Sequence, residues 1–147
     1  MRKIGITGGI GSGKSRLCRL FAERGVAVYD TDAAAKRLMT EDAALVESIK
    51  ARFGVESYAD GALNRSYLAA RVFSDTAERQ ALNGLVHPAV KADFVAWAEQ
   101  QAGDYVILES ALLFEAGLDA MVDAVVAVLA PEALRIERVQ QRDSVSE

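Results

Sequence analysis

The feature that most constrains the fold of this chain is a glycine-rich loop near its N-terminus. The loop fits the pattern G-x-x-x-x-G-K-[ST], with the residues Gly8, Gly9, Ile10, Gly11, Ser12, Gly13, Lys14 and Ser15. Its glycines allow the backbone to curl so that successive amide groups converge on phosphate oxygens. In a chain of this length such a match arises by accident with a probability on the order of one in two hundred. The loop therefore predicts a phosphate-binding turn between a strand and a helix.

The segments on either side of the loop have the patterns that this turn requires. A β-prone run at residues 4–7 precedes it, and a second run follows at residues 26–29. Between them, one helical face carries three apolar side chains, those of Leu17, Leu20 and Phe21. Gly25 is a suitable helix end. This order predicts a βαβ unit with a right-handed crossover in a parallel sheet.

Residues 33–102 are predicted to form a helical insertion. A helix with Thr40 as its N-cap is expected to run to Gly54, and Asp60-Gly61 predicts a turn. A further helix is predicted at residues 65–73.

Another helix is expected from Asp75, with Glu78 three residues later completing a cap-like pair. Pro88 is expected to interrupt or kink it, because proline lacks an amide donor and clashes with the preceding turn. Apolar runs at residues 105–108 and 122–129 predict strands covered on both faces, and Pro131 opens a final amphipathic helix. The expected fold is α/β, with four parallel strands, helices on both faces and the insertion between the second and third strands.

Composition narrows the function classes. The net charge is −4, yet residues 1–40 carry eight basic and three acidic side chains, so the remaining residues sum to −9. A basic first quarter suits a polyanionic ligand, although solvated helix faces explain these charges equally well. The acidic remainder disfavours a nucleic-acid partner.

Cys18 is the single cysteine, which favours a buried thiol in a reducing cytoplasm. No apolar run reaches the ~18 residues of a membrane span, so no membrane partner is expected.

The loop residues predict how a nucleotide would be held. Lys14 would neutralise the β- and γ-phosphates, and the Ser15 hydroxyl would bind a Mg²⁺ ion that bridges them. The implied ligand is a nucleoside triphosphate, most often ATP. Glu109 ends the third predicted strand, where an acidic residue supports Mg²⁺ or its waters in related loops, although a surface acid is an equal alternative.

Acceptor residues are expected at the carboxyl ends of neighbouring strands. Asp30 and Asp32 follow the second predicted strand, where a carboxylate could accept the proton of an attacking hydroxyl. The alternative is that either aspartate caps a helix that starts at Ala33.

Other polar residues have open assignments. Glu115 follows an apolar turn that could line a substrate cleft, and it is equally suited to the surface. Arg138 and Arg142 share a face of the last predicted helix, where they could close over phosphates or be solvated. His87 is the single histidine, and from spacing alone a bystander role is favoured. One histidine and one cysteine cannot form a metal site of their own.

Several motifs together resemble those of the dephospho-coenzyme A kinases. They run in family order along the chain as residues 4–15 (IGITGGIGSGKS), 30–35 (DTDAAA), 60–65 (DGALNR), 83–88 (NGLVHP), 112–115 (LLFE) and 141–143 (QRD). Ala111 departs from the proline that the family often has before Leu-Leu-Phe-Glu. The resemblance implies a three-layer P-loop kinase fold that transfers the ATP γ-phosphoryl group to the ribose 3′-hydroxyl of dephospho-coenzyme A.

The resemblance also implies residue roles and a domain plan. Asp32 would be the general base, and residues 9–15 would bind phosphate together with Arg138 and Arg142. The acceptor would be contacted by Thr7, Asp32, Arg65, His87, Leu113 and Glu115. Residues 1–147 would form one kinase domain lacking its C-terminal part, including the fifth strand, with residues 33–102 binding the acceptor and residues 131–147 beginning a lid.

Two other interpretations stay open from the sequence. One is another P-loop kinase, acting on a nucleoside monophosphate or a small metabolite. The other is a nucleotide-binding module without phosphotransfer. The oligomeric state is left open as well.

Overall fold

The computed structural model describes residues 1–9 and 12–129, which fall into two compact units. The first unit comprises residues 1–31 and those from Trp97 onward, and the second comprises residues 32–96. The predicted final helix from Pro131, with Arg138 and Arg142, lies outside the described residues, as do Ile10 and Gly11.

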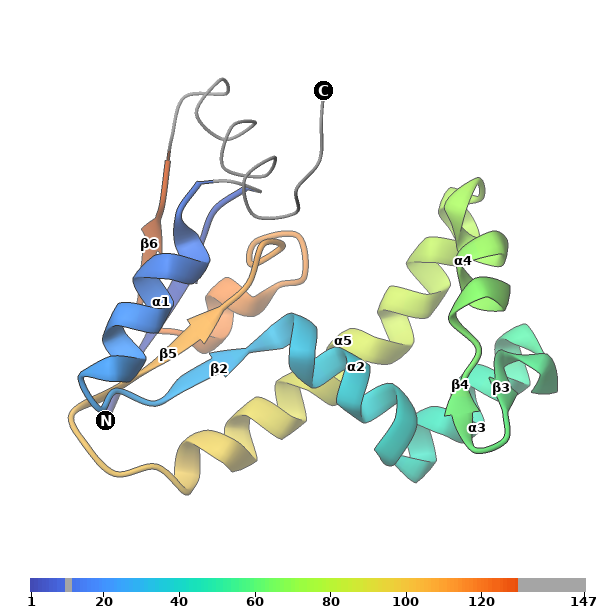
Figure 1. The fold of residues 1–147 in the computed structure, drawn as a ribbon, viewed down its shortest axis with the longest axis horizontal. Coiled ribbons are helices and arrows are strands. Elements are labelled where there is room, and N and C mark those ends of the chain that lie inside the picture. The colour runs from blue at the N-terminus through green and yellow to red at the C-terminus, as the bar shows by residue number, and fades with distance from the viewer. Residues whose placement is uncertain (10–11, 130–147) are drawn as a thin grey trace. The chain divides into compact units, whose positions relative to one another are not determined.

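The first unit is built on a four-stranded parallel sheet (Figure 1). Its strands are β1 (Arg2–Thr7), β2 (Val28–Asp30), β5 (Tyr105–Glu109) and β6 (Ala124–Ala127), in the order β2-β5-β1-β6. Every neighbouring pair is parallel, which confirms the predicted sheet. The helix α1 (Lys14–Glu23) connects β1 to β2, and a short 3-10 helix, η2 (Leu118–Met121), precedes β6.

Helix α1 covers one face of this sheet. Ile6 and Ile107 point toward it and form a buried cluster with Cys18, against which Leu17 and Phe21 pack. Leu20, predicted to share that apolar face, is instead 48% exposed. On the opposite face the ring of Trp97, from the last turn of α5 (Thr76–Glu99), lies 5.2 Å from the ring of Tyr29. The predicted cover of helices on both faces is therefore present.

The second unit is helical, with one small hairpin. It contains α2 (Thr31–Glu41), α3 (Ala43–Phe53), η1 (Val55–Ser57), β3 (Tyr58–Ala59), β4 (Ala62–Leu63), α4 (Arg65–Phe73) and most of α5. Its buried apolar side chains include those of Leu38, Leu45, Ile49, Phe53, Leu68, Val86, Val90 and Phe94. The turn predicted at Asp60-Gly61 is confirmed, and both residues have positive φ (53° and 78°), as a tight hairpin turn requires. The flanking strands are too short to be recognised from the sequence.

Two helix starts predicted in this region are wrong. Helix α2 begins at Thr31 rather than Ala33, so Asp32 lies in its first turn and is not its cap. Thr40 lies within α2, and the cap of α3 is Asp42, whose carboxylate accepts the Leu45 amide at 3.2 Å. Helix α3 buries Leu45, Ile49 and Phe53, and this burial stabilises the helix that Asp42 caps.

Pro88 does not end the helix that contains it, because α5 continues from Thr76 to Glu99. Val86, Val90 and Phe94 are buried on either side of the proline. Their burial offsets the lost amide bond, which explains why the predicted interruption is absent.

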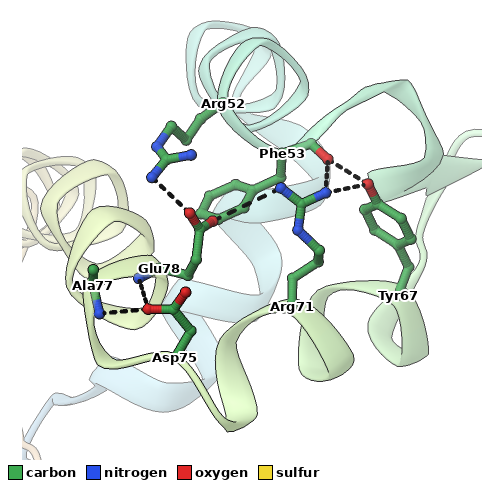
Figure 2. Close-up of polar contacts among 7 residues, drawn as sticks. All are labelled: Arg52, Phe53, Tyr67, Arg71, Asp75, Ala77 and Glu78. Atoms are coloured by element: carbon green, nitrogen blue, oxygen red, sulfur yellow. Dashed lines mark hydrogen bonds and ion pairs between the residues drawn. The ribbon is translucent and has the colours of Figure 1, made fainter.

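A polar cluster joins the ends of three helices in the second unit (Figure 2). The Glu78 carboxylate accepts a bond of 2.8 Å from Arg52, and Arg71 donates to the Phe53 carbonyl at 3.3 Å. The Tyr67 hydroxyl donates to the same carbonyl at 2.5 Å. The bonds from Arg71 and Tyr67 satisfy the Phe53 carbonyl, which the end of α3 would otherwise leave unpaired. Asp75 caps α5 as predicted, accepting the amides of Ala77 and Glu78.

None of the helices in the described ranges combines the length and apolarity that a bilayer crossing needs.

Candidate functional site

The glycine loop joins β1 to α1 in the context that its sequence predicts. Gly13 adopts φ 98° immediately before Lys14, the first residue of α1. Gly8 has no room for a side chain, because a Cβ there would lie 2.8 Å from the Val128 carbonyl oxygen and 2.5 Å from Ser12 Oγ. Within the described residues, α1 has neither a side-chain cap nor an acidic residue in its first turn. Its amide groups and dipole are thus suited to an anion.

Glu109 lies against the start of α1. The Lys14 ammonium donates to Glu109 Oε1 at 2.8 Å, and the Ser15 hydroxyl donates to the same oxygen at 3.0 Å. The Lys14 and Glu109 side chains are only 13% and 10% exposed. An ion pair this sheltered is screened less than a surface pair. The last residue of β5 therefore meets the first turn of α1, 95 residues earlier in the chain.

The sheet register explains why Glu109 points this way. Side chains alternate along a strand, and Ile107, two residues before Glu109, is packed beneath α1. Glu109 is paired with Ile6 on one side and with Asp30 on the other. The side chains of Asp30 and Glu109 thus start from the same face, at the carboxyl edge of adjacent strands.

Cys18 is buried beside this cluster, one helical turn after Lys14. Burial raises the pKa of its thiol to about 12, and the neighbouring carboxylates of Glu109 and Asp30 add to the rise. The thiol stays protonated at neutral pH, in keeping with the buried, non-ligand role predicted for it.

The two candidate bases have different positions. Asp30 is the exposed last residue of β2, and Asp32 is exposed in the first turn of α2. Thr31 between them is buried, and its hydroxyl donates to the Glu109 carbonyl at 2.8 Å.

In the apolar turn after β5, the predicted acceptor contact Leu113 is buried. Leu113 is fully buried, and its Cδ1 lies 2.6 Å from where a Cβ on Gly5 would stand. Its side chain is therefore not available to an acceptor in this structure. Leu112 and Phe114 are 53% and 57% exposed, and Glu115 is exposed beside them.

The remaining predicted site residues are spread over both units. Thr7 is buried at the end of β1, and Gly9 is exposed. Arg65 is exposed as the first residue of α4. His87 is half-buried in α5, where burial and then the charge of Lys91 lower its pKa.

The residues beside the loop fit a magnesium ion by their chemistry. The Ser15 hydroxyl and the Glu109 carboxylate are hard oxygen donors, and they contact each other at 3.0 Å. Mg²⁺ is usually bound by one or two protein oxygens together with phosphate oxygens and water. Within residues 1–9 and 12–129, no group of three His, Cys, Asp or Glu residues could hold a metal without such additional ligands.

Comparison with known proteins identifies the family. The family model for dephospho-CoA kinase matches residues 2–147. A dephospho-CoA kinase from Salinibacter ruber is 48% identical over 99% of this chain and 75% of its own length. Another from Porphyromonas gingivalis is 41% identical over 99% of this chain and 72% of its own.

Two solved structures resemble this chain in fold. The crystal structure of TT1252 from Thermus thermophilus matches with a TM-score of 0.84 at 37% identity, over 99% of this chain and 74% of that one. A dephospho-CoA kinase from Campylobacter jejuni shares the fold, with a TM-score of 0.66 at 24% identity over 98% of this chain and 74% of that one. The glycine loop, the parallel sheet and these matches lead to one conclusion: the chain belongs to the dephospho-CoA kinase family.

Proposed function

We propose that this chain transfers the γ-phosphoryl group of ATP to the ribose 3′-hydroxyl of dephospho-coenzyme A. The observation that carries the proposal is the cluster of Lys14, Ser15 and Glu109 at the carboxyl edge of the sheet, in a chain of this family. The compartment we propose is the reducing cytoplasm, which suits a chain with one free cysteine.

Lys14 and the loop amides would bind the phosphates. The ammonium of Lys14 and the N-terminal amides of α1 supply positive charge where the transferred group gains negative charge. Ser15 and Glu109 would hold Mg²⁺, which supplies charge neutralisation at the phosphates when bound. Arg138 and Arg142 are proposed as further phosphate ligands at the start of a lid over residues 131–147, by family resemblance alone.

Asp32 is proposed as the general base that takes the proton of the acceptor hydroxyl. It follows Thr31, whose side chain is bound to the carbonyl of Glu109, so its backbone is tied through one residue to the phosphate cluster. Asp30 is the alternative base, since the register places it beside Glu109. Substitution of each aspartate separates the two assignments.

Residues 33–102 are proposed to bind the acceptor, as the family resemblance implies. Arg65 offers an exposed guanidinium for the acceptor diphosphate, and His87 offers a ring nitrogen. Thr7 and Glu115 remain proposed acceptor contacts. In the turn after β5, exposure favours Leu112 and Phe114 over the buried Leu113 as contacts for the uncharged arm of the acceptor.

A coupled assay of ADP release tests this function. The chain is offered Mg·ATP with dephospho-coenzyme A, with nucleoside monophosphates in parallel reactions, and the product is identified by its mass. We expect release that depends on dephospho-coenzyme A and a product heavier by one phosphoryl group. Release driven by a nucleoside monophosphate instead would assign another kinase activity. ATP binding in calorimetry without any acceptor-dependent release would leave only a nucleotide-binding module.

A further inference from the structure

Ser110 is the first residue after β5, and its side chain bonds within the turn that follows. The residue is only 5% exposed. Its amide donates to the Ile6 carbonyl at 3.1 Å, so its backbone is held against β1. Its hydroxyl oxygen accepts a bond of 3.2 Å from the amide of Leu112. A serine that takes up an amide two residues later closes a local turn, which limits the backbone conformations of the residues between them.

The backbone of Leu112 is bound at both of its polar groups. Its amide is bound by Ser110, and its carbonyl accepts the Ala116 amide at 2.9 Å. Ala111 lies between Ser110 and Leu112, and alanine does not fix the backbone as a proline at this position would. The bond from the Ser110 hydroxyl therefore supplies a local restraint that the alanine does not provide.

The turn divides its apolar side chains into one anchor and two exposed groups. Leu113 is fully buried against Gly5, whereas Leu112 and Phe114 are more than half exposed. Packing holds Leu113 in place without any help from the serine. Loss of the Ser110 hydroxyl is therefore expected to release Leu112, which lies between the two points of attachment, and to leave the rest of the turn folded.

We propose that Ser110 is a positioning residue for acceptor binding. Its hydroxyl holds Leu112 in the orientation that contacts the uncharged arm of dephospho-coenzyme A. This inference rests on the proposed function, in which Leu112 and Phe114 touch that arm. A side chain held in place before binding loses less conformational freedom when the ligand arrives, so the ligand binds more tightly. Ser110 touches no reacting atom and acts through Leu112.

The contrasting possibility is that Ser110 contributes to stability alone. In that case its loss would lower the unfolding temperature and leave the affinity of the folded protein for its ligands unchanged. A double-mutant cycle with Leu112→Ala separates the two roles, because residues that act through one another have non-additive effects.

The test is calorimetric titration of dephospho-coenzyme A and, separately, of Mg·ATP, at a temperature where every variant is folded. We expect Ser110→Ala to weaken the binding of dephospho-coenzyme A about 5-fold and Leu112→Ala to weaken it about 10-fold. The double variant should also lose about 10-fold, where independent effects would multiply to about 50-fold. The affinity for Mg·ATP should stay within about twofold of wild type in all three variants.

Two further variants control for packing and for stability. Ser110→Cys fills nearly the same space with a much weaker hydrogen-bond acceptor, and it should reproduce the loss seen in Ser110→Ala. Val106→Ala removes buried apolar atoms near the start of β5, away from the turn. It should lower the unfolding temperature and keep the wild-type affinity for dephospho-coenzyme A.

The proposal is overturned if Ser110→Ala and Ser110→Cys keep the wild-type affinity for dephospho-coenzyme A, or if the effects in the double variant multiply. The outcomes for wild type distinguish it from the proposed function. Binding of dephospho-coenzyme A without acceptor-dependent ADP release refutes the proposed function and leaves the role of Ser110 to be decided by the cycle. Wild type that does not bind dephospho-coenzyme A contradicts both.

Discussion

The Thr31 hydroxyl donates a 2.8 Å hydrogen bond to the carbonyl oxygen of Glu109, which ties the end of β5 to the start of α2. Thr31 lies between the two candidate bases, and Glu109 binds Lys14 through its side chain. One buried hydroxyl thus connects the backbone of the proposed base to the strand that carries the phosphate cluster.

Replacing Thr31 with valine should destabilise the protein. The shape of the side chain is kept, but the Glu109 carbonyl loses a buried partner, which costs about 1–3 kcal/mol. Thr31→Ser keeps the hydroxyl and is the matched control, with a smaller loss. Denaturant unfolding of the two variants measures the difference. Equal stabilities would show that the hydrogen bond contributes nothing beyond packing.

Replacing Asp32 with asparagine should lower turnover by ~10²–10⁴-fold, the usual contribution of a general base. The affinity for ATP should hardly change, because the phosphates are bound by the loop. Steady-state assays and calorimetry with Asp30→Asn in parallel assign the role. If Asp30→Asn shows the large loss and Asp32→Asn changes turnover less than threefold, the base is Asp30.

Two glycine-to-alanine substitutions should have opposite effects on stability. A Cβ at Gly5 would lie 2.6 Å from Leu113 Cδ1 and 3.3 Å from Val122 Cγ2, so Gly5→Ala should cost about 1–3 kcal/mol. Gly84 lies within α5, where a Cβ would meet nothing within 4 Å, so Gly84→Ala should stabilise by about 0.5–1 kcal/mol. Thermal unfolding measures both. A stabilised Gly5→Ala would mean that Leu113 moves freely and does not anchor the turn after β5.

The stability of the protein should fall in mild acid partly through His87. Burial and Lys91 lower the pKa of His87 from 6.5, so the folded state binds its proton more weakly than the unfolded state does. The contribution is present above pH 6.5 and is lost as the pH falls through the lowered pKa. Unfolding free energies at pH 7.5 and 5.0 should therefore differ less in His87→Gln than in wild type. Parallel pH profiles for the two proteins would contradict this, because shared carboxylates titrate alike in both.

Local sequence determined those elements that depend only on residues close to one another in the chain. The glycines and the short apolar runs around them predict β1, the loop and α1, because their backbone requirements and periodicity are satisfied within about 20 residues. Asp60-Gly61 predicts its turn for the same reason, since positive φ at two successive positions strongly limits the residue types. The order of the motifs along the chain likewise indicates the family.

Tertiary structure decided which distant residues meet. Local sequence permits both Thr40 and Asp42 as caps and disfavours Pro88 within a helix, yet burial of whole helical faces outweighs these local preferences. Glu109 is equally suited to a surface position by its local sequence, and the pairing of β5 between β2 and β1 turns it toward α1. Leu113, which the family resemblance predicts as an acceptor contact, is buried against Gly5 in the same way. Strand order and register arise from contacts across some 100 residues, and no local propensity encodes them.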